Sequence, residues 1–200
     1  MHGASRNDRT FRPEHAAKLD DPARQEWLPP SEILGCLGLA SRMAMADIGA
    51  GTGYFALPAA KLLAPGELFA VDLEPQMLAV LGERASEANL INMRLVEGTA
   101  AATTLPDASC DVVLLANVWH ELEDHADVLR ECARILRAGG RVAILDWRAD
   151  IDTPPGPPRA HRIDESAVRA LLLSARWRVR NPPRTWQYSY LIMGEKEPSI

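Results

Sequence analysis

The chain has 200 residues, of which 47% are hydrophobic and 24% charged, and its formal net charge is −5. This length and balance suit one globular domain, and an acidic chain lacks the basic surplus of most nucleic-acid-binding proteins, so we expect no nucleic-acid partner. The sequence contains no run of about 20 apolar residues that could span a membrane and no apolar signal-peptide centre, which predicts no membrane association and a cytoplasmic location.

The N-terminal part is expected to be only partly ordered. Residues 1–12 are polar and aperiodic, so we predict a disordered tail there. Apolar spacing predicts a helix over residues 13–27 and a second over 32–37, for which Ser31 is a suitable N-cap. We expect one domain over residues 13–200, with no internal linker.

Strands and helices then alternate to about residue 175. We predict strands at 43–48, 67–71, 93–97, 111–116, 141–147, 176–180 and 186–193, and helices at 53–63, 75–88, 124–139 and 164–174. Alternation of this kind predicts an α/β fold with a doubly wound, mostly parallel sheet and helices on both faces. The last two strands are joined by a short turn and should pair antiparallel, which adds one antiparallel strand near the C-terminus.

The loop after the first predicted strand carries three alternating glycines, Gly49, Gly51 and Gly53, and Asp47 precedes them. Glycines let a backbone approach a ligand closely and adopt positive φ. The second strand ends at Asp72, where a carboxylate can accept hydrogen bonds from ribose hydroxyls. The βαβ unit therefore predicts a site for an adenosine-type ligand.

The spacing does not match the dinucleotide pattern, in which a third small residue would stand where this chain has Tyr54. No lysine follows the loop, which excludes a Walker-type phosphate site. The D-x-G-x-G-x-G form resembles the class I S-adenosylmethionine-dependent methyltransferases. The resemblance continues at Asp72–Leu78, Leu105–Val113 and Leu136–Val142, and so covers most of the chain.

The resemblance implies seven strands, S-adenosyl-L-methionine as the cofactor and in-line methyl transfer to a small-molecule acceptor. Where many family members have an acidic residue near the adenine, this chain has Thr99. The expected cofactor-binding residues are Asp47, Gly49, Ala50, Gly51, Gly53, Tyr54, Asp72, Leu73, Met77, Gly98, Thr99 and Asn117. Asp47 could equally hold the loop amides, and Met77 could equally be a core residue.

The segment after the fourth strand contains Trp119, His120 and Glu121. Here His120 is the candidate catalytic residue, as an acid–base group or an orienting group, because the pKa of histidine lies near neutrality. Alternatively, Trp119 covers the pocket and His120 is a structural hydrogen-bonding group. We expect Trp119 and Glu121, together with Asp146 and Trp147, to bind the acceptor.

The N-terminal segment 13–40 resembles a leader found in a subset of these methyltransferases, on Lys18, Leu19, Arg24 and Trp27. This resemblance implies a lid over a Rossmann-like core formed by residues 41–200, since lids exclude water from reactive cofactors. A helical segment packed on the edge of the domain is the alternative.

Other functions are weighed against methyl transfer. A Rossmann-type oxidoreductase and a catalytically silent cofactor-binding protein are the alternatives.

The widely separated Cys36, Cys110 and Cys132 indicate neither a disulfide nor a zinc site, and no metal ligand spacing is present, so no metal is expected. The oligomeric state is left open, with a homodimer as one option.

Overall fold

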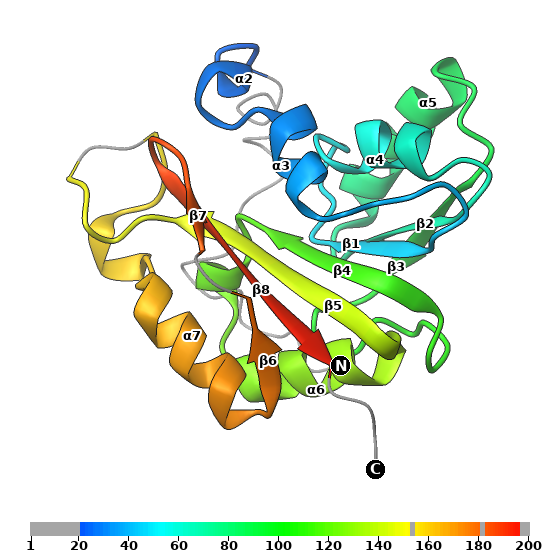
Figure 1. Cartoon of the computed structure of the whole chain (residues 1–200). Coiled ribbons are helices and arrows are strands. Elements are labelled where there is room, and N and C mark those ends of the chain that lie inside the picture. The colour runs from blue at the N-terminus through cyan, green and yellow to red at the C-terminus, as the bar shows by residue number, and fades with distance from the viewer. Residues whose placement is uncertain (1–20, 153–154, 181–182, 197–200) are drawn as a thin grey trace, which may run out of the picture.

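The computed structural model describes residues 21–152, 155–180 and 183–196, and the predicted disordered tail lies outside these ranges. One sheet runs through the molecule in the order β3-β2-β1-β4-β5-β8-β6, with β7 paired to β8 (Figure 1). The strands are β1 Met45–Ile48, β2 Leu68–Asp72, β3 Met93–Glu97, β4 Cys110–Ala116, β5 Leu136–Trp147, β6 Trp177–Val179, β7 Arg184–Thr185 and β8 Ser189–Lys196.

The pairing confirms the predicted doubly wound sheet. Strands β3, β2, β1, β4 and β5 pair parallel with one another. Strand β8 runs antiparallel to both β5 and β6, as the short turn between the last two predicted strands requires. The chain reverses direction across the sheet between β1 and β4, and ligands of open α/β sheets lie beyond the carboxyl ends of the strands at such a point.

Helices cover both faces of the sheet (Figure 1). The helices are α2 Arg24–Trp27, α3 Pro30–Cys36, α4 Ala56–Leu63, α5 Pro75–Glu87, α6 His125–Ile135 and α7 Glu165–Ser174, with 3-10 helices η2 Trp119–Glu121 and η3 Arg159–His161. One apolar core joins α6 and α7 to the sheet, and a second joins α3, α4 and α5 to the opposite face. Neighbouring residues of the central strands alternate between the cores: Val113 contributes to the first and Val112 to the second.

The predicted helix end at Gly139 is wrong. Asp124 caps α6 as expected, since its side chain accepts a hydrogen bond from the Asp127 amide at 3.0 Å. The helix ends at Ile135, however, because Leu136 adopts extended dihedral angles and pairs with Cys110 of β4. Residues 136–139, the predicted end of the helix, therefore belong to the sheet. Strand β5 begins at Leu136, five residues before the predicted start at Arg141.

No helix lies between β3 and β4 in this fully described part of the chain, and a loop over residues 98–109 joins them. The carboxylate of Glu131 on α6 holds this loop by accepting the Thr103 amide at 2.8 Å. Arg134 pairs with the same carboxylate at 2.8 Å and also with Asp107 at 2.5 Å. The loop is thus tied to α6, and its first residues, Gly98–Ala100, reach the carboxyl edge of the sheet.

The described part of the N-terminal segment packs on the body of the protein. The ring of Trp27 lies 5.5 Å from that of Trp147 at the end of β5 and 5.8 Å from that of Tyr188. The buried Leu28 joins the core of the α3 face, and Arg141 donates to the Leu37 carbonyl. Of the predicted leader, residues 13–20 lie outside the described ranges, so its role as a lid stays a prediction. Among the helices of the described ranges, none combines the length and the apolar character needed to cross a membrane.

Replacing Glu131 by Gln should destabilise the protein by about 1–3 kcal/mol at pH 7, because a buried charged hydrogen-bond acceptor is lost. Hydrogen bonds from Arg134 are the main cause that lowers the pKa of Glu131 to about 2, despite burial. A lowered pKa stabilises the fold above the ordinary value of 4.5, and this contribution disappears as the pH falls towards 2.

Thermal unfolding of the wild type and of Glu131→Gln between pH 7 and pH 3 measures this effect. The difference in stability should shrink over that range, and the exposed control Glu83→Gln should show no such trend. A difference independent of pH would contradict the charge argument.

Candidate functional site

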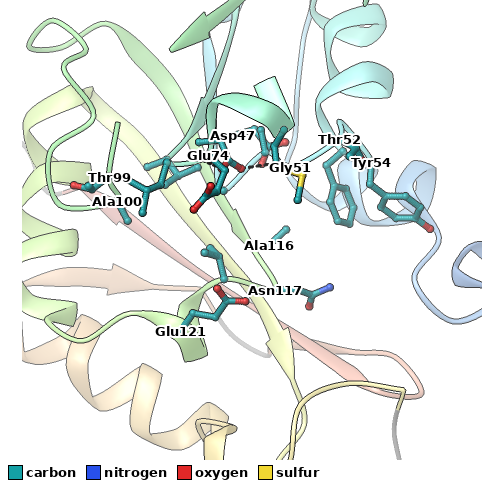
Figure 2. Close-up of a pocket in the computed structure, with 18 of the residues that line it drawn as sticks. Asp47, Gly51, Thr52, Tyr54, Glu74, Thr99, Ala100, Ala116, Asn117 and Glu121 are labelled. Atoms are coloured by element: carbon teal, nitrogen blue, oxygen red, sulfur yellow. Dashed lines mark hydrogen bonds between the residues drawn. The ribbon is translucent and has the colours of Figure 1, made fainter. Parts of the chain in front are cut away.

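A pocket opens beyond the carboxyl ends of β1, β2 and β4, at the predicted edge of the sheet (Figure 2). Every predicted cofactor-binding residue except Gly53 lines it: Asp47, Gly49, Ala50, Gly51, Tyr54, Asp72, Leu73, Met77, Gly98, Thr99 and Asn117. Residues far apart in the sequence are therefore brought into one cavity by the strand order.

The glycine loop is fixed by backbone hydrogen bonds. The amides of Gly49 and Ala50 donate to the Val71 carbonyl at 2.8 and 3.1 Å. Gly51 has φ of 53° and donates its amide to Oδ2 of Asp72 at 2.7 Å. These bonds attach the loop after β1 to the end of β2, so the wall of the pocket is held before any ligand binds.

The third glycine serves packing instead of the pocket. Gly53 has φ of +97°, and a Cβ placed on it would lie 2.3 Å from Cδ1 of Leu81 on α5 and 3.0 Å from Cγ of Leu57 on α4. Its amide donates to the Ala50 carbonyl. We therefore assign Gly53 to the junction of α4 and α5, which differs from the predicted ligand contact.

Asp72 both organises the loop and faces the pocket. Oδ2 accepts the Gly51 amide and Oδ1 accepts the Glu74 amide at 2.9 Å. Burial raises the pKa of Asp72, which the two backbone hydrogen bonds oppose. Each carboxylate oxygen keeps a further lone pair for a ligand hydroxyl.

Asp47 is a buried carboxylate at the base of the pocket, 2% exposed. Burial, with a smaller contribution from the charge of Asp72, raises the pKa of Asp47 to about 7. The loop amides of Gly49, Ala50 and Gly51 go to Val71 and Asp72 and not to Asp47. This arrangement favours the role towards a ligand cation over the alternative role of holding the loop.

Arg24 of α2 is a pocket residue that sequence reasoning assigned only to the leader. Its side chain is 8% exposed, and Cζ lies 4.0 Å from the centroid of the Tyr54 ring. The Tyr54 hydroxyl donates to the Leu28 carbonyl at 2.8 Å, which fixes the ring beneath the guanidinium. Among the described lining residues, Arg24 is the one basic side chain, against the four carboxylates of Asp47, Asp72, Glu74 and Glu121.

Another part of the pocket is mostly apolar. Leu73 and Met77 line it from the β2–α5 connection, and Gly98, Thr99 and Ala100 line it from the loop after β3. Met77 is 4% exposed and so serves the core and the pocket together. The backbone of Thr99 is paired with Ala102 at 3.2 and 3.1 Å, which holds this wall in place.

The segment after β4 divides between the pocket and the core. Asn117, Val118 and Glu121 line the pocket, and Asn117 and Glu121 lie across it from Gly51 (Figure 2). Asn117 has φ of 55°, and its buried Oδ1 has no hydrogen-bond partner among the described residues. A ligand donor would satisfy that oxygen.

The candidate catalytic residue does not line the pocket. His120 is 5% exposed, and its Nδ1 lies 2.8 Å from Oδ1 of the fully buried Asp146. Trp119 is 0% exposed and packs in the core beside His125, with a ring distance of 4.3 Å, so it does not cover the pocket. Trp147 is buried under Trp27.

Of the four predicted acceptor residues, only Glu121 therefore reaches the pocket. The lining residues that sequence reasoning did not assign to a site are Arg24, Ile48, Thr52, Phe55, Glu74, Ala100, Ala116, Val118 and Leu122. Most neighbour a predicted residue and could have been found by extending each motif by one position. Arg24 has no such signal, since its place at the pocket depends on how α2 packs. No group of three potential metal ligands occurs within the described ranges.

Comparisons with known proteins agree with this geometry. A family model described as "Methyltransferase domain" matches residues 46–144. A demethylmenaquinone methyltransferase of Listeria monocytogenes serotype 4a is 34% identical over 101 residues, or 50% of this chain and 43% of that protein. One of Thermus thermophilus is 35% identical over 114 residues, or 56% of this chain and 48% of that protein.

A solved structure extends the likeness to nearly the whole chain. The crystal structure of a SAM dependent methyltransferase from Aquifex aeolicus has a TM-score of 0.87 and 27% identity, and it covers 93% of this chain and 99% of that one. The matches to the two curated relatives span less than half of those relatives' length.

Gly53→Ala should destabilise the fold by about 1–3 kcal/mol, because the added methyl group overlaps Leu81 and the backbone has positive φ. The matched control is Gly35→Ala in α3, where nothing lies within 4 Å of an added Cβ. That control should be neutral or stabilising by about 0.5–1 kcal/mol. Denaturant unfolding of the two variants compares them, and equal stabilities would refute the packing role of Gly53.

Proposed function

We propose that this chain, which belongs to the class I S-adenosylmethionine-dependent methyltransferase family, transfers the methyl group of S-adenosylmethionine to a small-molecule acceptor. The observation that carries the proposal is the glycine loop hydrogen-bonded to Asp72 above the buried carboxylate of Asp47. In this pocket, Asp72 offers hydrogen-bond acceptors to the ribose hydroxyls, and Asp47 offers a negative charge to an amino group.

The residues present fit each part of the cofactor. Asp72 would hold the ribose hydroxyls through its remaining lone pairs. Asp47 would pair with the α-amino group, and Arg24 would pair with the α-carboxylate, because these are the buried anion and the one described cation of the pocket. Leu73 and Met77 would face the adenine, whose polar edge would meet backbone groups near Thr99.

When bound, S-adenosylmethionine supplies a methyl group on an electrophilic sulfonium, which an acceptor atom can displace in line. The contribution of the protein is then alignment and exclusion of water. The loop and the strand ends provide the alignment, since hydrogen bonds to Val71 and Asp72 hold them. Arg24 lines one side of the pocket, and the contact of Trp27 with Trp147 packs its helix on the body of the protein.

The class of acceptor is proposed from the relatives. Two relatives are named demethylmenaquinone methyltransferases, so demethylmenaquinone is the first candidate acceptor to assay. A cytoplasmic location, the absence of nucleic-acid and membrane partners and the option of a homodimer also stay proposals, as does a single domain over residues 13–200.

Calorimetry with S-adenosylmethionine, S-adenosylhomocysteine and NADH tests the proposal directly. We expect binding of the first two and no binding of NADH, followed by transfer of labelled methyl groups to an acceptor found by screening for S-adenosylhomocysteine release. The control Gly51→Val should not bind, because a branched side chain would enter the pocket. Binding of NADH in preference to S-adenosylmethionine would refute the proposal, and binding without any turnover would favour the catalytically silent alternative.

Cofactor affinity should depend on pH through Asp47. Since the pKa of Asp47 is raised to about 7, the carboxylate is mostly protonated at pH 6 and must lose its proton to pair with the amino group. Affinity for S-adenosylmethionine should therefore rise by up to about tenfold from pH 6 to pH 8, with proton release on binding at pH 6.

The measurement is calorimetry in buffers of different ionisation enthalpy. Asp47→Asn should bind more weakly and lose the pH dependence, whereas Glu74→Gln, which removes another carboxylate of the pocket, should keep it. Unchanged proton release in Asp47→Asn would show that another group titrates.

A further inference from the structure

The three residues of η2 point in different directions because a 3-10 helix has three residues per turn. Of these three residues, Glu121 lines the pocket and Trp119 packs in the core. His120 lies on another face and is directed into the core towards β5. The residue of this segment that meets a ligand is therefore Glu121, whose side chain lies across the pocket from the glycine loop (Figure 2).

The imidazole of His120 is held from behind by Asp146. The two oxygens of Asp146 accept the His120 backbone amide at 2.8 Å and contact Nδ1 at 2.8 Å, and the Trp147 amide also donates to this carboxylate at 2.8 Å. A carboxylate beside Nδ1 requires that nitrogen to be the donor. The other ring nitrogen, Nε2, lies 3.8 Å from Oε1 of Glu121.

The charges around His120 favour its protonated form. Burial lowers the pKa of His120, but the hydrogen bond and charge of Asp146 and the charge of Glu121 outweigh it, and the net direction is upward. Arg162, the remaining charged group that acts on the ring, opposes them. The protonated ring would lie between two carboxylates, and the side chain of Glu121 is only 14% exposed.

We propose that Glu121 is the residue that distinguishes the cationic cofactor from its neutral product, and that His120 and Asp146 act behind it as positioning residues. The proposal rests on the proposed function. S-adenosylmethionine carries a positive sulfonium, and S-adenosylhomocysteine carries an uncharged thioether. A mostly buried carboxylate in the same pocket attracts the sulfonium but not the thioether, so it favours exchange of product for fresh cofactor. His120, whose Nε2 lies 3.8 Å from Oε1 of Glu121, positions that carboxylate.

The test compares affinities for the two ligands by calorimetry and needs no acceptor. Glu121→Gln should lower the affinity for S-adenosylmethionine about tenfold and change the affinity for S-adenosylhomocysteine less than about threefold. The substitution removes the charge and keeps the shape of the side chain nearly constant. Glu121→Asp should retain most of the preference. The control Glu123→Gln removes the same charge from an exposed position two residues on and should leave both affinities unchanged.

Two further measurements separate a charge effect from a structural one. Histidine NMR titration should show a lower pKa for His120 in Glu121→Gln than in the wild type and no change in Glu123→Gln. In His120→Gln, the ratio of the affinities for S-adenosylmethionine and S-adenosylhomocysteine should fall, because Glu121 loses the imidazole that positions it. Thermal unfolding checks that each variant is folded.

The outcomes are distinguishable from failure of the proposed function. A wild-type protein that binds neither ligand refutes that function. A wild type that binds both, with Glu121→Gln affecting them equally or not at all, overturns only the role of Glu121. A lowered preference in Glu121→Gln that Glu121→Asp restores supports it.

Discussion

The hydrogen bond from the Gly51 amide to the Asp72 carboxylate is the constraint on which the rest of the site depends. It joins the loop after β1 to the end of β2, so the ends of two neighbouring parallel strands form one continuous wall of the pocket. Gly51 has positive φ, so a side chain at this position would be strained and would lie beside the pocket. If β2 ended before Asp72, the carboxylate would no longer reach the Gly51 amide. Because the wall is complete without a ligand, little ordering is needed when one binds.

The pocket is rich in carboxylates because the wall formed by β1 and β2 contains Asp47 and Asp72. Asp47 and Asp72 lie on adjacent strands close enough for each charge to disfavour the other, and burial adds to this. A pocket with four carboxylates and one described guanidinium is suited to a ligand with two positive groups and one negative group. The fold therefore brings together like charges whose repulsion a complementary ligand would relieve.

The α2 segment connects this pocket to the C-terminal half of the chain. Arg24 reaches the pocket over the Tyr54 ring, while Trp27, three residues on, lies against Trp147 and Tyr188. Trp186 adds a hydrogen bond from its indole nitrogen to Glu32 at 3.0 Å. Contacts of this kind place the N-terminal helices where strand β5 ends and strand β8 begins, although no sequence motif links these regions.

The sequence by itself determined the local features: the glycine loop after the first strand, Asp72 at the end of the second strand, and the alternation of strands and helices that predicts the sheet. These patterns depend on neighbouring residues, so periodicity and spacing are enough to find them. The tertiary structure decided which side chains face the ligand. His120 and Glu121 are adjacent in sequence, yet the phase of a single 3-10 turn sends one to Asp146 and the other to the pocket. Likewise, Gly53 faces Leu81 and Arg24 faces Tyr54 only because helices far apart in the chain pack against each other.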